Sequence, residues 1–126
     1  MNPILLVEII SALAALCCLT TLLGNLLWMI GRANGTSGRR LKAHRTLGVV
    51  LLVCAAIHGI AATIYASGAS PMAYAAGWGA LALMAASGAC AFGPIRKRIC
   101  NPLRWHIGLF LIGTAFFVIH AVAAHL

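Results

Sequence analysis

The sequence predicts an all-α membrane protein, a four-helix transmembrane bundle in up-down-up-down order. Hydrophobic residues make up 63% of the 126 residues, only 8% are charged, and the mean hydropathy is +1.02. The chain also divides into four apolar runs, each close to the roughly 20 residues that a helix needs to cross a bilayer. Only short connections separate the runs, so we expect a single transmembrane domain over residues 1–126.

The four expected helices cover about residues 4–30, 46–66, 73–93 and 106–126. The first run has no basic segment before it and exceeds a signal-peptide core, so we interpret it as a retained helix. Small residues dominate the third run, which favours close packing in lipid and a scaffold role. Short connections make successive helices antiparallel, so helices two and four run in the same direction.

All nine Lys and Arg residues lie in two clusters, between runs one and two and between runs three and four. They are Arg32, Arg39, Arg40, Lys42 and Arg45, then Arg96, Lys97, Arg98 and Arg104. By the positive-inside rule both clusters face the cytoplasm, and both termini lie outside a membrane that we expect to be the prokaryotic cytoplasmic membrane. Topology and lipid headgroups account for the net charge of +8, so no nucleic-acid partner is expected.

Two pairs of histidines share one spacing. His44 and His58 are 14 residues apart, and so are His106 and His120. On a helix this spacing puts both members within about 40° of one face and about 21 Å apart along the axis. The second pair follows the first by 62 residues, which suggests two repeats of one helical hairpin.

The parallel direction of helices two and four gives these histidines matching depths. His44 and His106 would lie at the inner membrane boundary, and His58 and His120 in the outer half. An ionisable side chain in lipid is costly unless it is partnered, which indicates a functional reason for all four. Two facing imidazoles supply the axial ligands of a haem iron. We therefore expect two stacked b-type haems, with pairs His44/His106 and His58/His120, and an interfacial position for His125.

Two glycines and two arginines are further candidates for these cofactor sites. Gly113 is midway between His106 and His120, and Gly48 is one turn after His44, so each could leave room for a porphyrin. Ordinary packing of helices in lipid is the alternative explanation.

Arg45 and Arg104, with Lys42 and Arg40 nearby, could pair with the propionates of the inner haem, although topology alone also explains them. Around the outer haem, polar contacts would come from Tyr65, Ser67, Ser70, Tyr74 and Trp78.

The segments "KAHRTLGVVLLVCAAIHG" and "RWHIGLFLIGTAFFVIH" resemble the paired histidine helices of transmembrane di-haem b-type cytochromes, especially the ferric-reductase-like group and small bacterial cytochrome b subunits. The resemblance implies haem ligation by His44, His58, His106 and His120. It also implies an electron-transfer subunit of a membrane oxidoreductase, connecting the quinone pool with a separate redox partner protein.

Glu8 is the single acidic residue, near the start of the first run. It could accept a proton from quinol near the outer haem, or it could extend to the headgroups. The same glutamate permits an alternative function, a small four-helix proton-coupled multidrug exporter. A transition-metal transporter is less suitable, because each level offers only two imidazoles. We interpret the five cysteines as packing residues.

Overall fold

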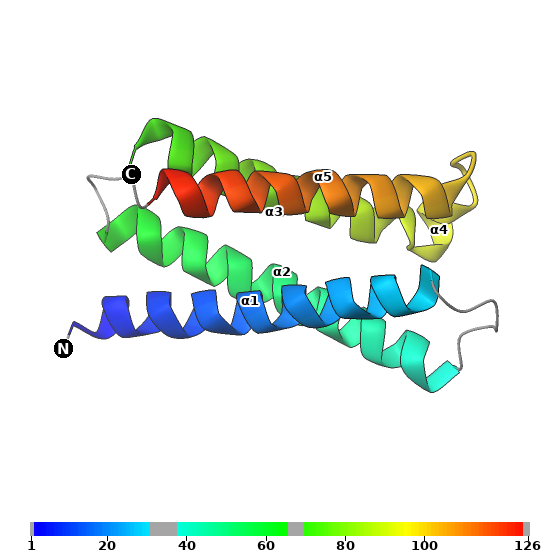
Figure 1. The fold of residues 1–126 in the computed structure, drawn as a ribbon, viewed down its shortest axis with the longest axis horizontal. Helices are drawn as coiled ribbons and strands as arrows, with labels where there is room; N and C mark the ends of the chain where they lie inside the picture. Colours follow the sequence, from blue (N-terminus) through cyan, green and yellow to red (C-terminus); the bar gives the residue numbers. More distant parts are fainter. Residues whose placement is uncertain (1, 31–37, 66–69, 125–126) are drawn as a thin grey trace. The chain divides into compact units, whose positions relative to one another are not determined.

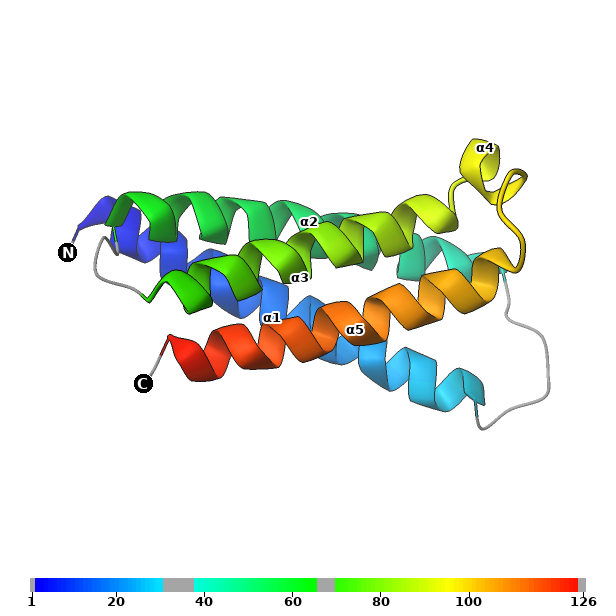
Figure 2. The ribbon, with the colours of Figure 1, turned by 90° about the horizontal axis from the view of Figure 1, so that it is seen from above.

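The computed structural model describes residues 2–30, 38–65 and 70–124, and these parts of the chain are helical, with no strand among them (Figures 1 and 2). The helices are α1 (Pro3–Ile30), α2 (Gly38–Tyr65), α3 (Pro71–Cys90), α4 (Gly93–Arg96) and α5 (Pro102–Ala123). All but α4 are long and apolar enough to cross a membrane. The predicted all-α class and the four membrane spans are confirmed, and the chain is a multi-pass membrane protein.

Large apolar side chains lie exposed along the four long helices. Examples are Leu13 at 57% exposure, Val49 at 61% and Val118 at 54%. In water, so much exposed apolar surface would favour aggregation or a partner protein. In a bilayer the same surface faces lipid tails, which is consistent with the lipid contact expected from the sequence.

The chain forms two compact units, Met1–Ala62 and Thr63–Leu126, and each is described by itself. In the first unit α1 and α2 form an antiparallel hairpin. Near the start of α1, Glu8 lies beside His58, and near its end the Trp28 ring lies 3.9 Å from the Arg40 guanidinium. Both contacts join the two helices, so the hairpin is held together near each of its ends.

The second unit is an antiparallel hairpin of α3 and α5, joined through the short α4. Its two helices approach closely around Gly113, where an added Cβ would lie 3.0 Å from Met84 Cγ and 3.4 Å from the Ala80 carbonyl oxygen. Ser70 caps the start of α3 by accepting from the Ala73 N–H, and its hydroxyl also donates to the Ala123 carbonyl at 3.4 Å.

Several predicted helix ends were wrong. α2 begins at Gly38 rather than 46, α5 begins at Pro102 rather than 106, and α3 ends at Cys90 rather than 93. The predicted bounds followed hydropathy, whereas a helix continues through polar residues that favour it, such as Arg, Leu, Lys and Ala in the first turns of α2. His44 therefore lies inside α2, and Arg39 to Arg45 belong to this helix rather than to a loop.

The connection between α3 and α5 also differs from the prediction, which did not include α4. Pro94 stands near the start of this four-residue helix, where proline is tolerated. Asn101 then adopts a left-handed conformation with φ of 54°, which asparagine tolerates better than most residues. Pro102 follows at the first position of α5, where its fixed φ suits a helix start.

Candidate cofactor-binding site

His106 of α5 is held by Ser87 of α3. The His106 Nδ1 lies 2.8 Å from the Ser87 carbonyl oxygen and 3.0 Å from Ser87 Oγ, and this hydroxyl donates to the His106 carbonyl at 2.8 Å. Ser87 is 1% exposed. It belongs to the last turn of α3, whose carbonyls have no partner further along the helix. One of these carbonyls thus accepts from an imidazole on the neighbouring helix.

His120 has the same arrangement one level away. Its Nδ1 lies 2.8 Å from the Ala73 carbonyl oxygen near the start of α3. The ring reaches this carbonyl because Gly77 has no side chain: a Cβ there would lie 2.9 Å from His120 Nδ1 and 3.1 Å from Cε1. Such separations are closer than a van der Waals contact allows, so the position of the imidazole depends on glycine at residue 77.

The two contacts share one register. Ala73 and Ser87 are 14 residues apart on α3, matching the spacing of His120 and His106 on α5. The close contact at Gly113 lies midway, opposite Ala80. One helix pairing thus sets the orientation of both imidazoles of α5.

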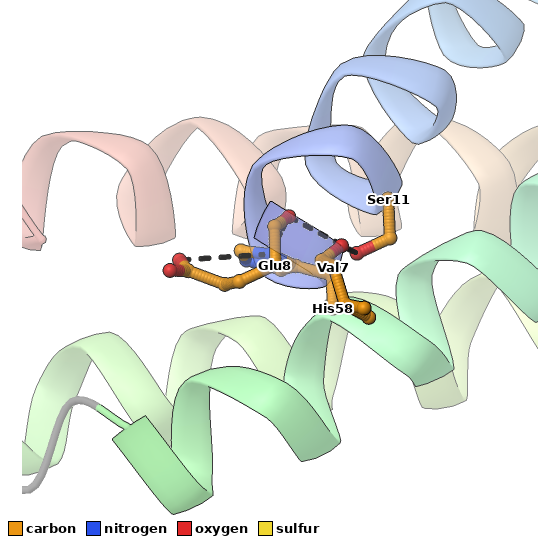
Figure 3. A network of polar contacts seen from close by, with 4 residues as sticks. All are labelled: Val7, Glu8, Ser11 and His58. Atoms are coloured by element: carbon orange, nitrogen blue, oxygen red, sulfur yellow. Dashed lines mark hydrogen bonds and ion pairs between the residues drawn. The ribbon is translucent and has the colours of Figure 1, made fainter. Parts of the chain in front are cut away.

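His58 of α2 has its contact in the first hairpin. Its Nδ1 lies 3.4 Å from the Glu8 backbone oxygen and 3.9 Å from Glu8 Oε1 (Figure 3). The His58 and Glu8 side chains are each 23% exposed. His58 thus faces both a carbonyl and a carboxylate of α1.

The three imidazoles therefore have the same chemistry. A carbonyl oxygen only accepts hydrogen bonds, so a ring nitrogen facing one carries the proton. His58, His106 and His120 each face a backbone carbonyl through Nδ1, which places the lone pair on Nε2. Histidines that bind metals are oriented by such a hydrogen bond from the second ring nitrogen. This set of donors fits the axial ligation of haem iron.

His44 lies half-buried within α2. Near it in sequence, Lys42 and Arg45 line an open hollow of about 450 Å³, together with Gly38, Leu41 and Thr46. Both cations are exposed and could contact an anionic group. An added Cβ at Gly48 meets no described atom within 4 Å, so the packing of the described helices does not require glycine there.

The remaining candidates are distributed as follows. Gly113 is buried against α3, where its described contacts are those of helix packing. Arg104 is exposed in the first turn of α5. Ser70 caps α3, while Tyr65 and Trp78 are each 43% exposed. Ser67 and His125 lie outside the described residues.

Sequence reasoning missed the residues of α3 that contact the histidines, Ala73, Gly77 and Ser87. The third run was interpreted only as a scaffold because its residues are small. The signal that could have identified them is the 14-residue spacing of Ala73 and Ser87, which repeats that of the histidines in an antiparallel neighbour. Two of the three contacts use backbone carbonyls, and every residue has a carbonyl, so residue type gives no further indication.

Within residues 2–30, 38–65 and 70–124, no three His, Cys, Asp or Glu side chains are grouped so that they could hold one metal ion. The members of the predicted pairs His44/His106 and His58/His120 belong to different units, and their pairing stays a prediction. No protein-family model, curated protein or solved structure matches this chain.

Proposed function

We propose that this protein is a di-haem cytochrome b membrane subunit that carries electrons across the membrane. His44 and His106 would hold the inner haem, and His58 and His120 the outer haem. Electrons would pass between the quinone pool and a separate redox partner protein. When bound, each haem supplies a one-electron carrier whose iron changes between the ferric and ferrous states.

One observation carries the proposal: the Nδ1 atoms of His58, His106 and His120 each face a backbone carbonyl. A histidine serving only as a polar packing residue could satisfy either nitrogen, and three of them would show no common choice. Orientation through Nδ1 leaves Nε2 as the coordinating atom in each case. Equal spacing of 14 residues on two membrane-spanning helices adds to this support.

The protein's own residues would set the properties of each site. The Ala73 and Ser87 carbonyls keep the α5 imidazoles in one tautomer and one orientation. Exposed cations near His44 would pair with propionates, since Lys and Arg form strong charge-assisted bonds to carboxylates. The apolar surroundings exclude water and so limit reorganisation when an electron arrives.

The test is a reduced-minus-oxidised visible spectrum of the purified protein, with a pyridine haemochrome count per chain. We expect the spectrum of bis-histidine b-type haem and two haems per chain. A colourless protein with correctly inserted helices would exclude a cytochrome. Proton-coupled export of cationic compounds by wild type and Glu8→Gln would then be the assay for the exporter.

The first substitution to make is His120→Ala, which removes one proposed ligand. It should lower the haem content from about two per chain to about one, because bis-histidine ligation requires both imidazoles. The matched control is His125→Ala, a histidine of the same region to which we assign no haem, which should keep both. Equal haem content in the two variants would contradict the proposed ligand set.

A further inference from the structure

The only acidic residue in the sequence contacts one of the proposed haem ligands. Glu8 Oε1 lies 3.9 Å from His58 Nδ1, and the Glu8 backbone oxygen lies 3.4 Å from the same nitrogen. His106 and His120 instead face the carbonyls of Ser87 and Ala73, which carry no net charge. His58 is therefore the described ligand with an anionic side chain beside it.

The first turns of α1 hold this glutamate in place. Ser11 is 6% exposed, and its hydroxyl donates to the backbone oxygens of Val7 at 2.7 Å and Glu8 at 3.0 Å. The Glu8 carbonyl thus faces both the Ser11 hydroxyl and the His58 ring, with the carboxylate extending along the same ring (Figure 3). Both Glu8 and His58 are mostly shielded, and a charge acts more strongly on its neighbours where water is excluded.

We propose that Glu8 is a positioning residue for His58 and that its carboxylate lowers the midpoint potential of the haem that His58 binds. This inference rests on the proposed function. A carboxylate beside Nδ1 makes the imidazole more basic, and a more basic ligand stabilises ferric iron. The negative charge acts in the same direction, because the ferric state carries one more positive charge than the ferrous state. The two haems would thereby acquire different potentials.

The experiment is a spectroelectrochemical titration of the haem-loaded protein and of its Glu8→Gln variant. The variant removes the charge and keeps the size of the side chain. We expect the potential of the His58 haem to rise, so that the ratio of oxidised to reduced haem at a fixed potential falls about tenfold, which is about 59 mV for a one-electron couple. The His44 haem should keep its potential. Loss of one transition in His120→Ala assigns the two haems.

The matched control is Ser11→Ala, which alters the same turn of α1 and leaves the carboxylate in place. Its potentials should stay close to those of wild type. Two bound haems with unchanged potentials in Glu8→Gln, or equal shifts in Glu8→Gln and Ser11→Ala, would overturn the role of Glu8 while leaving the cytochrome intact. Absence of haem from wild type would instead refute the proposed function.

A second measurement needs no variant at position 8. Histidine-selective ¹⁵N NMR of the haem-free protein in detergent reports which ring nitrogen carries the proton. We expect the Nδ1–H tautomer for His58, with its resonance assigned by His58→Gln. An Nε2–H tautomer at His58 would contradict the proposed contact with Glu8.

Discussion

At the scale of single residues, the candidate site depends on atoms that are easily overlooked in a sequence. The His120 ring occupies the space that a side chain at residue 77 would fill, and its Nδ1 thereby reaches the Ala73 carbonyl at 2.8 Å. The four histidines could be identified from their spacing, because each is an unusual residue in an apolar run. Ala73 and Gly77 could not, because alanine and glycine are common in helices that pack in lipid.

The Gly77→Ala variant tests this contact. The added Cβ would lie 2.9 Å from His120 Nδ1, so the imidazole must move and the hydrogen bond to Ala73 should be lost. We expect the chain to lose the haem assigned to His120 and to unfold with a free energy lower by about 1–3 kcal/mol. Haem content and thermal unfolding in detergent measure the two effects. Full haem content in this variant would show that the close contact is not needed for binding.

At the scale of helices, the packing of α3 against α5 places two imidazoles with a single register. The buried Gly113 lies at the centre of this pairing, midway between the two histidine contacts. From sequence, Gly113 and Gly48 were interpreted alike as room for a porphyrin. The described contacts separate them, because a Cβ at Gly113 would be 3.3 Å from Leu83 Cβ, whereas one at Gly48 meets no described atom within 4 Å.

Alanine at these two glycines should therefore have different effects. Gly113→Ala should reduce the stability of the second hairpin by about 1–3 kcal/mol, because Leu83 Cβ and the Ala80 backbone cannot move as freely as a side-chain end. Gly48→Ala is the control and should leave that stability unchanged or slightly raised, since alanine favours a helix over glycine. Thermal unfolding of both variants in one detergent provides the comparison. Similar losses would contradict the packing role of Gly113.

At the scale of the whole molecule, the charges are divided by position along each hairpin. Among the described residues, Arg39, Arg40, Lys42 and Arg45 lie in the first turns of α2, and Arg96 lies in α4. Glu8 lies near the other end of the first hairpin, in the second turn of α1. If the basic ends face the cytoplasm, positive charge surrounds the inner haem and negative charge the outer one. This distribution would favour the electron on the inner haem in the absence of a membrane potential.

Cysteine labelling in sealed vesicles of known orientation tests this topology. Cys100 is exposed between α4 and α5, at the basic end of the second hairpin. In a variant that keeps only this cysteine, a membrane-impermeant maleimide should react from the cytoplasmic side. Ser70→Cys in a cysteine-free background should react only from the opposite side. The reverse pattern would invert the topology and exchange the positions assigned to the inner and outer haems.

The sequence by itself determined the four membrane spans, the clustering of basic charge and the equal spacing of the histidines. Hydropathy and helical periodicity are properties of a continuous segment, so they need no knowledge of neighbouring helices. It located the helix ends less well, because polar residues that favour a helix extend it beyond the apolar run, as at Gly38.

Only the tertiary structure decided which atom of each described imidazole faces a carbonyl, that Gly113 lies in a helix contact, and that Glu8 lies beside His58. Each of these depends on which residue of an adjacent helix stands opposite. That register follows from the packing of two surfaces against one another, and neither helix specifies it alone.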